Sequence, residues 1–168
     1  MPDCRAPVAV FDSGLGGISV LRELVRTLPR ENYLYFGDSL HAPYGTKTPQ
    51  EVISLSLQAA DRLLSQGAKA LVVACNTATS AAIRTLRKTY PELAIVGTEP
   101  AIKPAVERHP GGRILMLATA MTVQEEKFQR LKAQDKTVLL ASHSAEDIAR
   151  ACDVIYEMED GELHLVKQ

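Results

Sequence analysis

The sequence predicts an α/β fold with a doubly wound, largely parallel sheet. Short runs of Val, Ile, Leu and Ala recur between longer segments with helical periodicity, and buried parallel strands have this near-continuous apolar character. Alternation of strand and helix implies a sheet with helices on both faces and with ligands beyond the carboxyl ends of its strands. The predicted strands are residues 6–11, 32–36, 70–74, 94–97 and 113–118.

Two of the intervening segments have apolar residues at helical spacing, as core-facing helices do. The first stripe consists of Leu21, Leu24, Val25 and Leu28. The second consists of Ile53, Leu57, Ala60 and Leu64.

Composition narrows the class of protein. A chain of 168 residues with 46% hydrophobic residues is long enough for one domain with its own core. Its net charge of −1 does not favour a nucleic-acid partner. No apolar run is long enough to span a bilayer and the amino terminus lacks the order of a secretory signal, so we expect a cytoplasmic protein that does not bind membranes. Three cysteines without a C-x-x-C pair argue against a zinc site or a disulfide framework.

Cys75 stands where the third strand ends and a helix begins. The positive end of a helix stabilises a thiolate relative to a thiol, so this cysteine is a candidate reactive group. The alternative is a buried, inert cysteine. Asn76, Thr77 and Thr79 add donors suited to holding a carboxylate at the helix amino terminus, although ordinary capping would also explain them.

Asp12 and Ser13 follow the first strand and open a glycine-rich turn. Asp12 is a candidate to accept a proton or to orient an ammonium group, and its alternative is a turn-forming aspartate. Ser19 occupies the position where a dinucleotide-binding loop has its third glycine, and no GK[ST] follows. The turn is therefore a weak candidate for binding phosphate.

Five segments together closely resemble the glutamate racemase family. They are VFDSGLGGISVLREL, YFGDSLHAPYGTKT, VVACNTATSAAI, VGTEPAIKPA and LATAMTVQEEKFQRL. The resemblance covers about residues 8–131 and corresponds to the first lobe of a two-lobed family. It implies interconversion of L- and D-glutamate for bacterial peptidoglycan by two thiols, with no cofactor and no metal. It also allows a homodimer.

Carried over motif by motif, the resemblance assigns an acid/base role to Cys75, with Asp12 assisting it or orienting the substrate's amino group. The residues that it implies for substrate binding are Ser13, Tyr44, Gly45, Asn76, Thr77, Thr119 and Thr122.

The family's opposing thiol lies in a Gly-Cys-Thr-His segment, which this sequence does not contain. Neither Cys4 nor Cys152 is followed by Thr-His. We therefore expect a truncated first lobe over residues 1–134. The alternatives are a non-catalytic remnant that binds glutamate or a partner, and a related two-cysteine racemase acting on another amino acid such as aspartate.

Residues 135–168 resemble the carboxyl end of an ABC transporter ATPase subunit, in which His143 would be the switch-loop histidine. Without a GxxxxGK[ST] segment we do not expect ATP binding, so an ABC ATPase fragment is the least favoured alternative. The pattern predicts a strand over 137–142, a helix over 145–151, and a hairpin of 154–160 with 162–166 that turns at Asp160-Gly161.

Overall fold

A computed structural model describes residues 4–98, 108, 155–159 and 162–167. The chain divides into two compact units, residues 1–100 and 101–168, and each is described by itself. The boundary expected between residues 134 and 135 stays a prediction.

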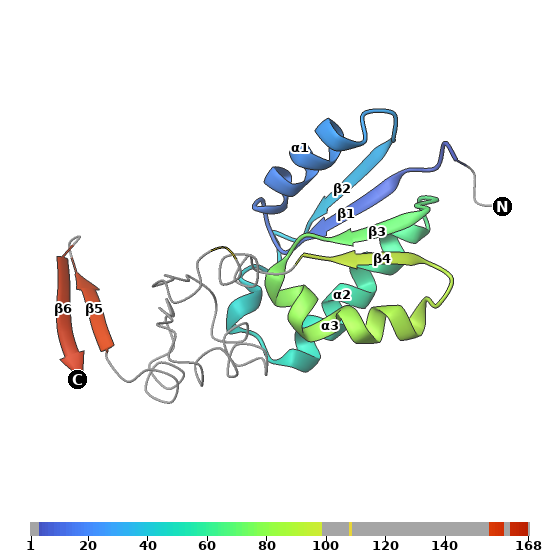
Figure 1. The fold of residues 1–168 in the computed structure, drawn as a ribbon. Helices are drawn as coiled ribbons and strands as arrows, with labels where there is room; N and C mark the ends of the chain where they lie inside the picture. The colour runs from blue at the N-terminus through green and yellow to red at the C-terminus, as the bar shows by residue number, and fades with distance from the viewer. Residues whose placement is uncertain (1–3, 99–107, 109–154, 160–161, 168) are drawn as a thin grey trace. The chain divides into compact units, whose positions relative to one another are not determined.

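The first unit contains a four-stranded parallel sheet with the order β2-β1-β3-β4 (Figure 1). Its strands are β1 (Val8–Asp12), β2 (Tyr33–Gly37), β3 (Ala70–Val73) and β4 (Ala94–Gly97). This confirms the predicted α/β class, and each of these strands lies within two residues of its expected bounds. The expected strand over 113–118 lies outside the described residues.

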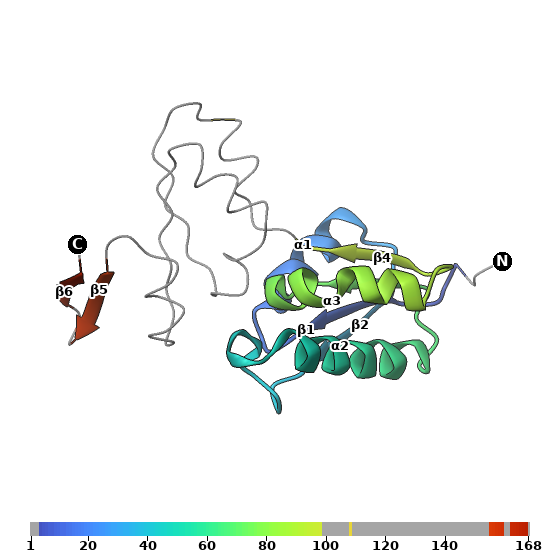
Figure 2. The same cartoon turned by 90° about the horizontal axis from the view of Figure 1, so that it is seen from below.

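Helices cover both faces of this sheet, as the alternation predicts (Figures 1 and 2). One face carries α1 (Gly17–Thr27), and the other carries α2 (Pro49–Leu64) and α3 (Asn76–Thr89). A capping box starts α2, because the Thr48 side chain accepts from the Glu51 amide while the Glu51 carboxylate accepts from the Thr48 amide. A short 3-10 turn, η1 (Tyr44–Thr46), precedes that helix.

The buried stripe of α2 is shifted by one position along the sequence from the predicted stripe. Ile53, Leu57 and Leu64 are half-buried, and only Ala60 of the predicted set is fully buried. Ser56 can enter the core because its hydroxyl donates to the carbonyl of Val52. The buried residues of α2 are Val52, Ser56, Ala59, Ala60 and Leu63.

The predicted stripe of α1 is only partly correct. Leu21 and Leu24 pack with Val20 against the core residues around Val10. Val25 and Leu28, in contrast, are 44% and 49% exposed. The prediction fails at Leu28 because the helix ends at Thr27 and Leu28 is its C-cap residue. At Val25 it fails because the side of α1 that packs on the described sheet is narrower than the predicted stripe.

The second unit contains an antiparallel hairpin of β5 (Ile155–Glu159) and β6 (Glu162–Lys167). This confirms the predicted hairpin. The expected strand over 137–142 and helix over 145–151 lie outside the described residues. Among the helices that the structure describes, none is long and apolar enough to cross a membrane.

The first glycine-rich loop lies directly against the end of β2. A Cβ atom on Gly37 would stand 2.2 Å from the carbonyl oxygen of Gly14, a distance that no side chain tolerates. The Tyr35 hydroxyl donates to that same carbonyl at 2.8 Å. Gly37 therefore lets the loop after β1 and the end of β2 lie in contact.

We expect Gly37→Ala to lower the free energy of unfolding by about 1–3 kcal/mol or more, because the added methyl group must push the Gly14 backbone away. Urea unfolding measures this loss. Gly14→Ala is the matched control, since a Cβ there meets nothing closer than an Asp12 carboxylate oxygen at 4.0 Å. Equal losses in the two variants would contradict this account of the loop.

Candidate functional site

Polar side chains gather where the order of the strands reverses. The connection through α1 leads from β1 to β2 on one side, while α2 and its loops lead across to β3 on the other side of β1. The crevice beyond the carboxyl ends of β1 and β3 is where open α/β sheets bind ligands. Asp12 ends β1, and Cys75 follows β3.

Cys75 is the N-cap residue of α3, as predicted. Its extended backbone starts the helix, and its Sγ accepts from the amide of Ala78 at 3.4 Å. The side chain is buried, with 6% of its surface exposed. A thiolate at this position would lie at the positive end of a helix, next to an amide that already points at the sulfur.

Ser13 lies directly beside this cysteine. The Sγ of Cys75 and the Oγ of Ser13 are 3.2 Å apart, and the thiol donates to the hydroxyl. A serine hydroxyl can both accept and donate. Ser13 can therefore serve the thiol as acceptor and the thiolate as donor without any movement of the backbone.

Asp12 is buried at the start of the glycine-rich loop. Its Oδ2 accepts from the amide of Gly14 at 3.0 Å, which is the turn-forming role named as its alternative. A Cβ on Gly17 would stand 2.6 Å from the Cβ of Asp12 and 3.0 Å from that of Ala74. Gly17 thus allows α1 to begin against the carboxylate.

Tyr44 is 1% exposed, and its hydroxyl donates to Oδ2 of Asp38 at 2.7 Å. Its ring lies 6.2 Å from the ring of Phe11, measured between centroids. Burial raises the pKa of Tyr44 most, followed by the hydrogen bond and charge of Asp38 and then by the charges of Cys75 and Asp12. Tyr44 therefore belongs to the same electrostatic environment as the two predicted catalytic residues.

Asp38 was not among the predicted site residues. It is 7% exposed, its amide donates to the carbonyl of Asp12 at 2.9 Å, and its carboxylate binds both Tyr44 and His41. The available signal was its place directly after β2, which is the rule that singled out Asp12 and Cys75. Within that loop, the family resemblance pointed only to Tyr44 and Gly45, so Asp38 was missed.

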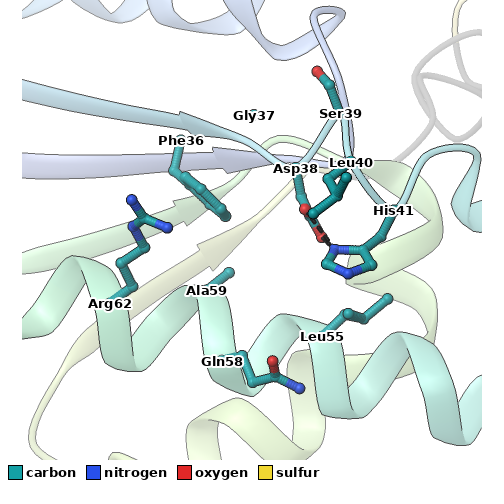
Figure 3. Close-up of a pocket in the computed structure, with 10 residues that line it drawn as sticks. All are labelled: Phe36, Gly37, Asp38, Ser39, Leu40, His41, Leu55, Gln58, Ala59 and Arg62. Atoms are coloured by element: carbon teal, nitrogen blue, oxygen red, sulfur yellow. Dashed lines mark hydrogen bonds and ion pairs between the residues drawn. The ribbon is translucent and has the colours of Figure 1, made fainter.

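His41 and Asp38 line a cavity of about 360 Å³ between α2 and the loop after β2 (Figure 3). The Nδ1 of His41 lies 2.8 and 3.0 Å from the two carboxylate oxygens of Asp38. The guanidinium of Arg62 lies over the Phe36 ring at the other side of this cavity, 5.2 Å from its centroid. One wall of the cavity is therefore the carboxylate that also holds Tyr44.

The remaining candidates are placed as follows. Asn76 is exposed at the start of α3, Thr77 is buried in the same turn, and Gly45 is half-buried in η1. The Thr79 hydroxyl donates to the carbonyl of Val73, in keeping with a structural role. The residues Thr119, Thr122, His143 and Cys152 lie outside the described part of the chain.

Cys4 lies away from this crevice. The Lys69 amide donates to the Pro7 carbonyl and the Lys69 ammonium to the Cys4 carbonyl, so Cys4 lies by the residue that precedes β3. Cys75 follows the same strand. Between residues 4 and 98, Cys75 is thus the one thiol at the carboxyl end of the sheet.

Comparison with known proteins gives the family of this chain. A family model described as Asp/Glu/Hydantoin racemase matches residues 10–163. The chain belongs to this family. The match runs through most of the segment that resembles an ABC transporter ATPase subunit, and that second resemblance has no support from the comparisons.

Curated members of the racemase family are similar over about three quarters of the chain. A glutamate racemase of Clostridium perfringens is 56% identical over 127 residues, which are 76% of this chain and 49% of that protein. One of Clostridium novyi is 54% identical over 132 residues, 79% of this chain and 51% of that protein. The chain spans about half the length of the curated relatives that it matches.

Solved racemase structures share the fold. Glutamate racemase from Thermus thermophilus, in complex with β-chloro-D-alanine, is 40% identical with a TM-score of 0.64, covering 83% of this chain and 51% of that one. The Escherichia coli enzyme, in complex with L-glutamate and the activator UDP-MurNAc-Ala, is 32% identical with a TM-score of 0.72, covering 86% of this chain and 55% of that one.

We expect Tyr44→Phe to lower the free energy of unfolding by about 1–3 kcal/mol at neutral pH, because it leaves the buried Asp38 carboxylate short of a donor. The raised pKa of Tyr44 adds a pH dependence. The phenol ionises near its ordinary value of 10.0 in the unfolded chain and above it in the folded one. The stability that the folded chain gains from this raised pKa is complete below pH 10 and is lost progressively as the pH rises above 10.

The gap between wild type and Tyr44→Phe should therefore narrow by about 1.4 kcal/mol for each pH unit above 10. Urea unfolding of both proteins between pH 7 and 11 measures it, and the subtraction removes the contributions of the other tyrosines. A gap that stays constant or widens would rule out a raised pKa at this position.

Proposed function

We propose that this chain provides the Cys75 side of a cofactor-independent racemase site that acts on glutamate. The observation that carries the proposal is the position of Cys75, a buried N-cap thiol at the strand-order reversal with Sγ 3.2 Å from the Ser13 hydroxyl. The family match and the glutamate complexes of its relatives, with L-glutamate in the Escherichia coli enzyme and D-glutamate in that of Francisella tularensis, support glutamate as the substrate.

The reaction needs a base aimed at the α-hydrogen. That hydrogen is weakly acidic, so a base must be held in place beside it and the developing negative charge must be stabilised. The Cys75 thiolate is the base, with the Ser13 hydroxyl and the Ala78 amide directed at the sulfur. Asp12, at the start of the neighbouring loop, orients the ammonium group of the substrate.

The other substrate contacts are proposed on the same basis. The family resemblance supports a binding role for five residues. They follow β1, β2 or β3 along the chain and are Ser13, Tyr44, Gly45, Asn76 and Thr77. Thr119 and Thr122 carry the same proposed role from the resemblance alone.

A base on one side of the α-carbon can remove a hydrogen and return one to that side. Inversion needs an acid on the opposite side, and the described part of the chain has no second thiol at this edge of the sheet. The chain by itself should then exchange the α-hydrogen of one enantiomer with solvent and leave its configuration unchanged.

Incubation of the pure chain with L-glutamate or D-glutamate in deuterated water tests this. We expect deuterium at the α-carbon of one enantiomer, followed by proton NMR, with no change in optical rotation. Cys75→Ser should lower the exchange rate by about a hundredfold or more, as expected for the loss of a positioned base.

The matched control is Cys4→Ser, which removes an exposed thiol near the amino ends of the strands and should leave the exchange unchanged. Full racemisation by the chain would disprove the proposal that it provides one side only. Exchange that survives Cys75→Ser would remove Cys75 from the mechanism.

A second function, glutamate binding without turnover, is favoured by one observation. The thiol is 6% exposed, so the site can be formed and yet be closed to the α-carbon. In that case glutamate at about ten times its Kd should raise the melting temperature by a few degrees. Differential scanning calorimetry detects this, with glutarate as the control ligand that lacks the amino group. An unchanged melting temperature in millimolar glutamate would reject binding.

A homodimer and a cytoplasmic location stay predictions. The exposed apolar side chains Ile18 and Val25 of α1 and Leu28 at its C-cap favour an association of two copies.

A further inference from the structure

The hydrogen of the Tyr44 hydroxyl is donated to a carboxylate within the protein. It donates to Oδ2 of Asp38 at 2.7 Å, and the tyrosine has 1% of its surface exposed. A phenol has one hydrogen to donate. Tyr44 therefore cannot donate a hydrogen to a substrate as long as this bond is made, and its hydroxyl oxygen can only accept. Its other contributions to the site come from its ring and from the η1 turn that it begins.

The turn that Tyr44 begins lies beside the helix that Cys75 caps. Tyr44 lies against the Phe11 ring, which belongs to the strand that ends in Asp12, and η1 contacts α3. Cys75 is only 6% exposed, so the groups around it limit access to its sulfur.

Asp38 is itself held from three directions. Its amide donates to the Asp12 carbonyl at 2.9 Å, its carboxylate accepts from the Tyr44 hydroxyl, and the Nδ1 of His41 meets both of its oxygens. An ionised carboxylate only accepts, so the Nδ1 of His41 carries the hydrogen. Charge-assisted bonds of this kind are stronger than neutral ones.

We propose that Asp38 is a positioning residue, which holds Tyr44 and the η1 turn in place and so controls access to the Cys75 thiol. Its value for catalysis rests on the proposed racemase function. The effect on the thiol does not, because access to the sulfur can be measured without any substrate.

The chain contains a matched Tyr-Asp pair for comparison. The Tyr90 hydroxyl donates to Oδ1 of Asp61 at 2.6 Å and joins the carboxyl-terminal ends of α3 and α2. That pair has the same chemistry but lies away from Cys75, which is at the opposite end of α3. Loss of the Asp61 carboxylate therefore reports what a broken Tyr-Asp bond does to the fold in general.

The experiment measures the alkylation rate of Cys75 by iodoacetamide in the full chain between pH 6 and 10. Trypsin cleaves after Lys69 and Arg84, so one peptide of residues 70–84 contains Cys75 and no other cysteine. Mass spectrometry of this peptide follows Cys75 independently of the other two thiols. The plateau rate at high pH measures access to the sulfur, separately from the fraction of thiolate.

We expect Asp38→Ala to raise the plateau rate about tenfold or more, because the ring loses a charge-assisted bond. Tyr44→Phe keeps the ring and removes the same bond from its other end, so it should raise the plateau as well. Asp38→Asn keeps an acceptor of similar size for the Tyr44 hydroxyl and should stay within about twofold of wild type. Asp61→Ala should leave the plateau unchanged.

The cavity beside Asp38 provides a rescue test. His41 and Asp38 both line this space of about 360 Å³, so a small carboxylate can reach the position that Asp38→Ala vacates (Figure 3). Formate should lower the raised rate of Asp38→Ala toward that of wild type, and chloride at the same ionic strength should not. Formate should have no effect on Tyr44→Phe.

Two results would overturn the proposal. One is an unchanged plateau in both Asp38→Ala and Tyr44→Phe, and the other is an equal rise in Asp61→Ala, which would indicate general loosening. Failure of glutamate to exchange its α-hydrogen would count against the proposed function and leave these thiol measurements as they stand.

Discussion

The carboxyl ends of β1 and β3 are neighbours, but the chain leaves β1 on one face of the sheet and reaches β3 from the other. Among the helices described, α1 begins on one side of the crevice between these two ends and α3 on the other, so neither covers it. Buried polar groups need hydrogen-bond partners, and here the described partners come from the loops and helix starts around the crevice. This constraint limits which residues can lie there.

Most of the polar groups around the crevice are held by the protein. The Asp12 carboxylate accepts from a loop amide, and the Thr98 hydroxyl donates to the carbonyls of Val73 and Ala74. Asp38 is divided between Tyr44 and His41. The pair of Cys75 and Ser13 lies among these hydrogen-bonded groups. When the thiol loses or gains a proton, the Ser13 hydroxyl can change from acceptor to donor by rotation about its C–O bond. A thiol that must gain and lose a proton is suited to such surroundings.

The sequence predicted the fold because the fold follows from local patterns, and the same patterns gave the candidate site residues. Parallel strands are apolar throughout, so β1 to β4 could be found from composition, and polar residues after strands marked Asp12, Ser13 and Cys75. Two kinds of feature were out of reach. The faces of α1 and α2 depended on how much sheet each helix covers and on a serine that satisfies its own hydroxyl in the core. The Asp38-Tyr44 bond depended on which way two side chains turn within one loop, which spacing does not encode.

The sequence also does not show which glycines are required by packing. The pattern Asp12-Ser13-Gly14-Leu15-Gly16-Gly17 indicates a tight loop but not what that loop touches. In the structure the decisive glycines are Gly17, which lets α1 begin against Asp12, and Gly37, which lies in another segment and receives the Gly14 carbonyl. The pairing of β1 with β3, in which Phe11 lies opposite Val73, is what brings Ser13 to Cys75.

The geometry also bears on the stereochemistry of the proposed reaction. The Ser13 hydroxyl of the glycine-rich loop lies 3.2 Å from the sulfur of Cys75. Under the proposed function, a substrate held by this loop meets the sulfur with one side of its α-carbon. Cys4 lies near the opposite ends of the strands, and no movement of a side chain could bring it to the other side. Under the proposed function, removal of the α-hydrogen and delivery of a hydrogen from the opposite side are therefore separable steps. The first belongs to residues of β1, β3 and their loops, and the acid that completes an inversion must come from outside this edge of the sheet.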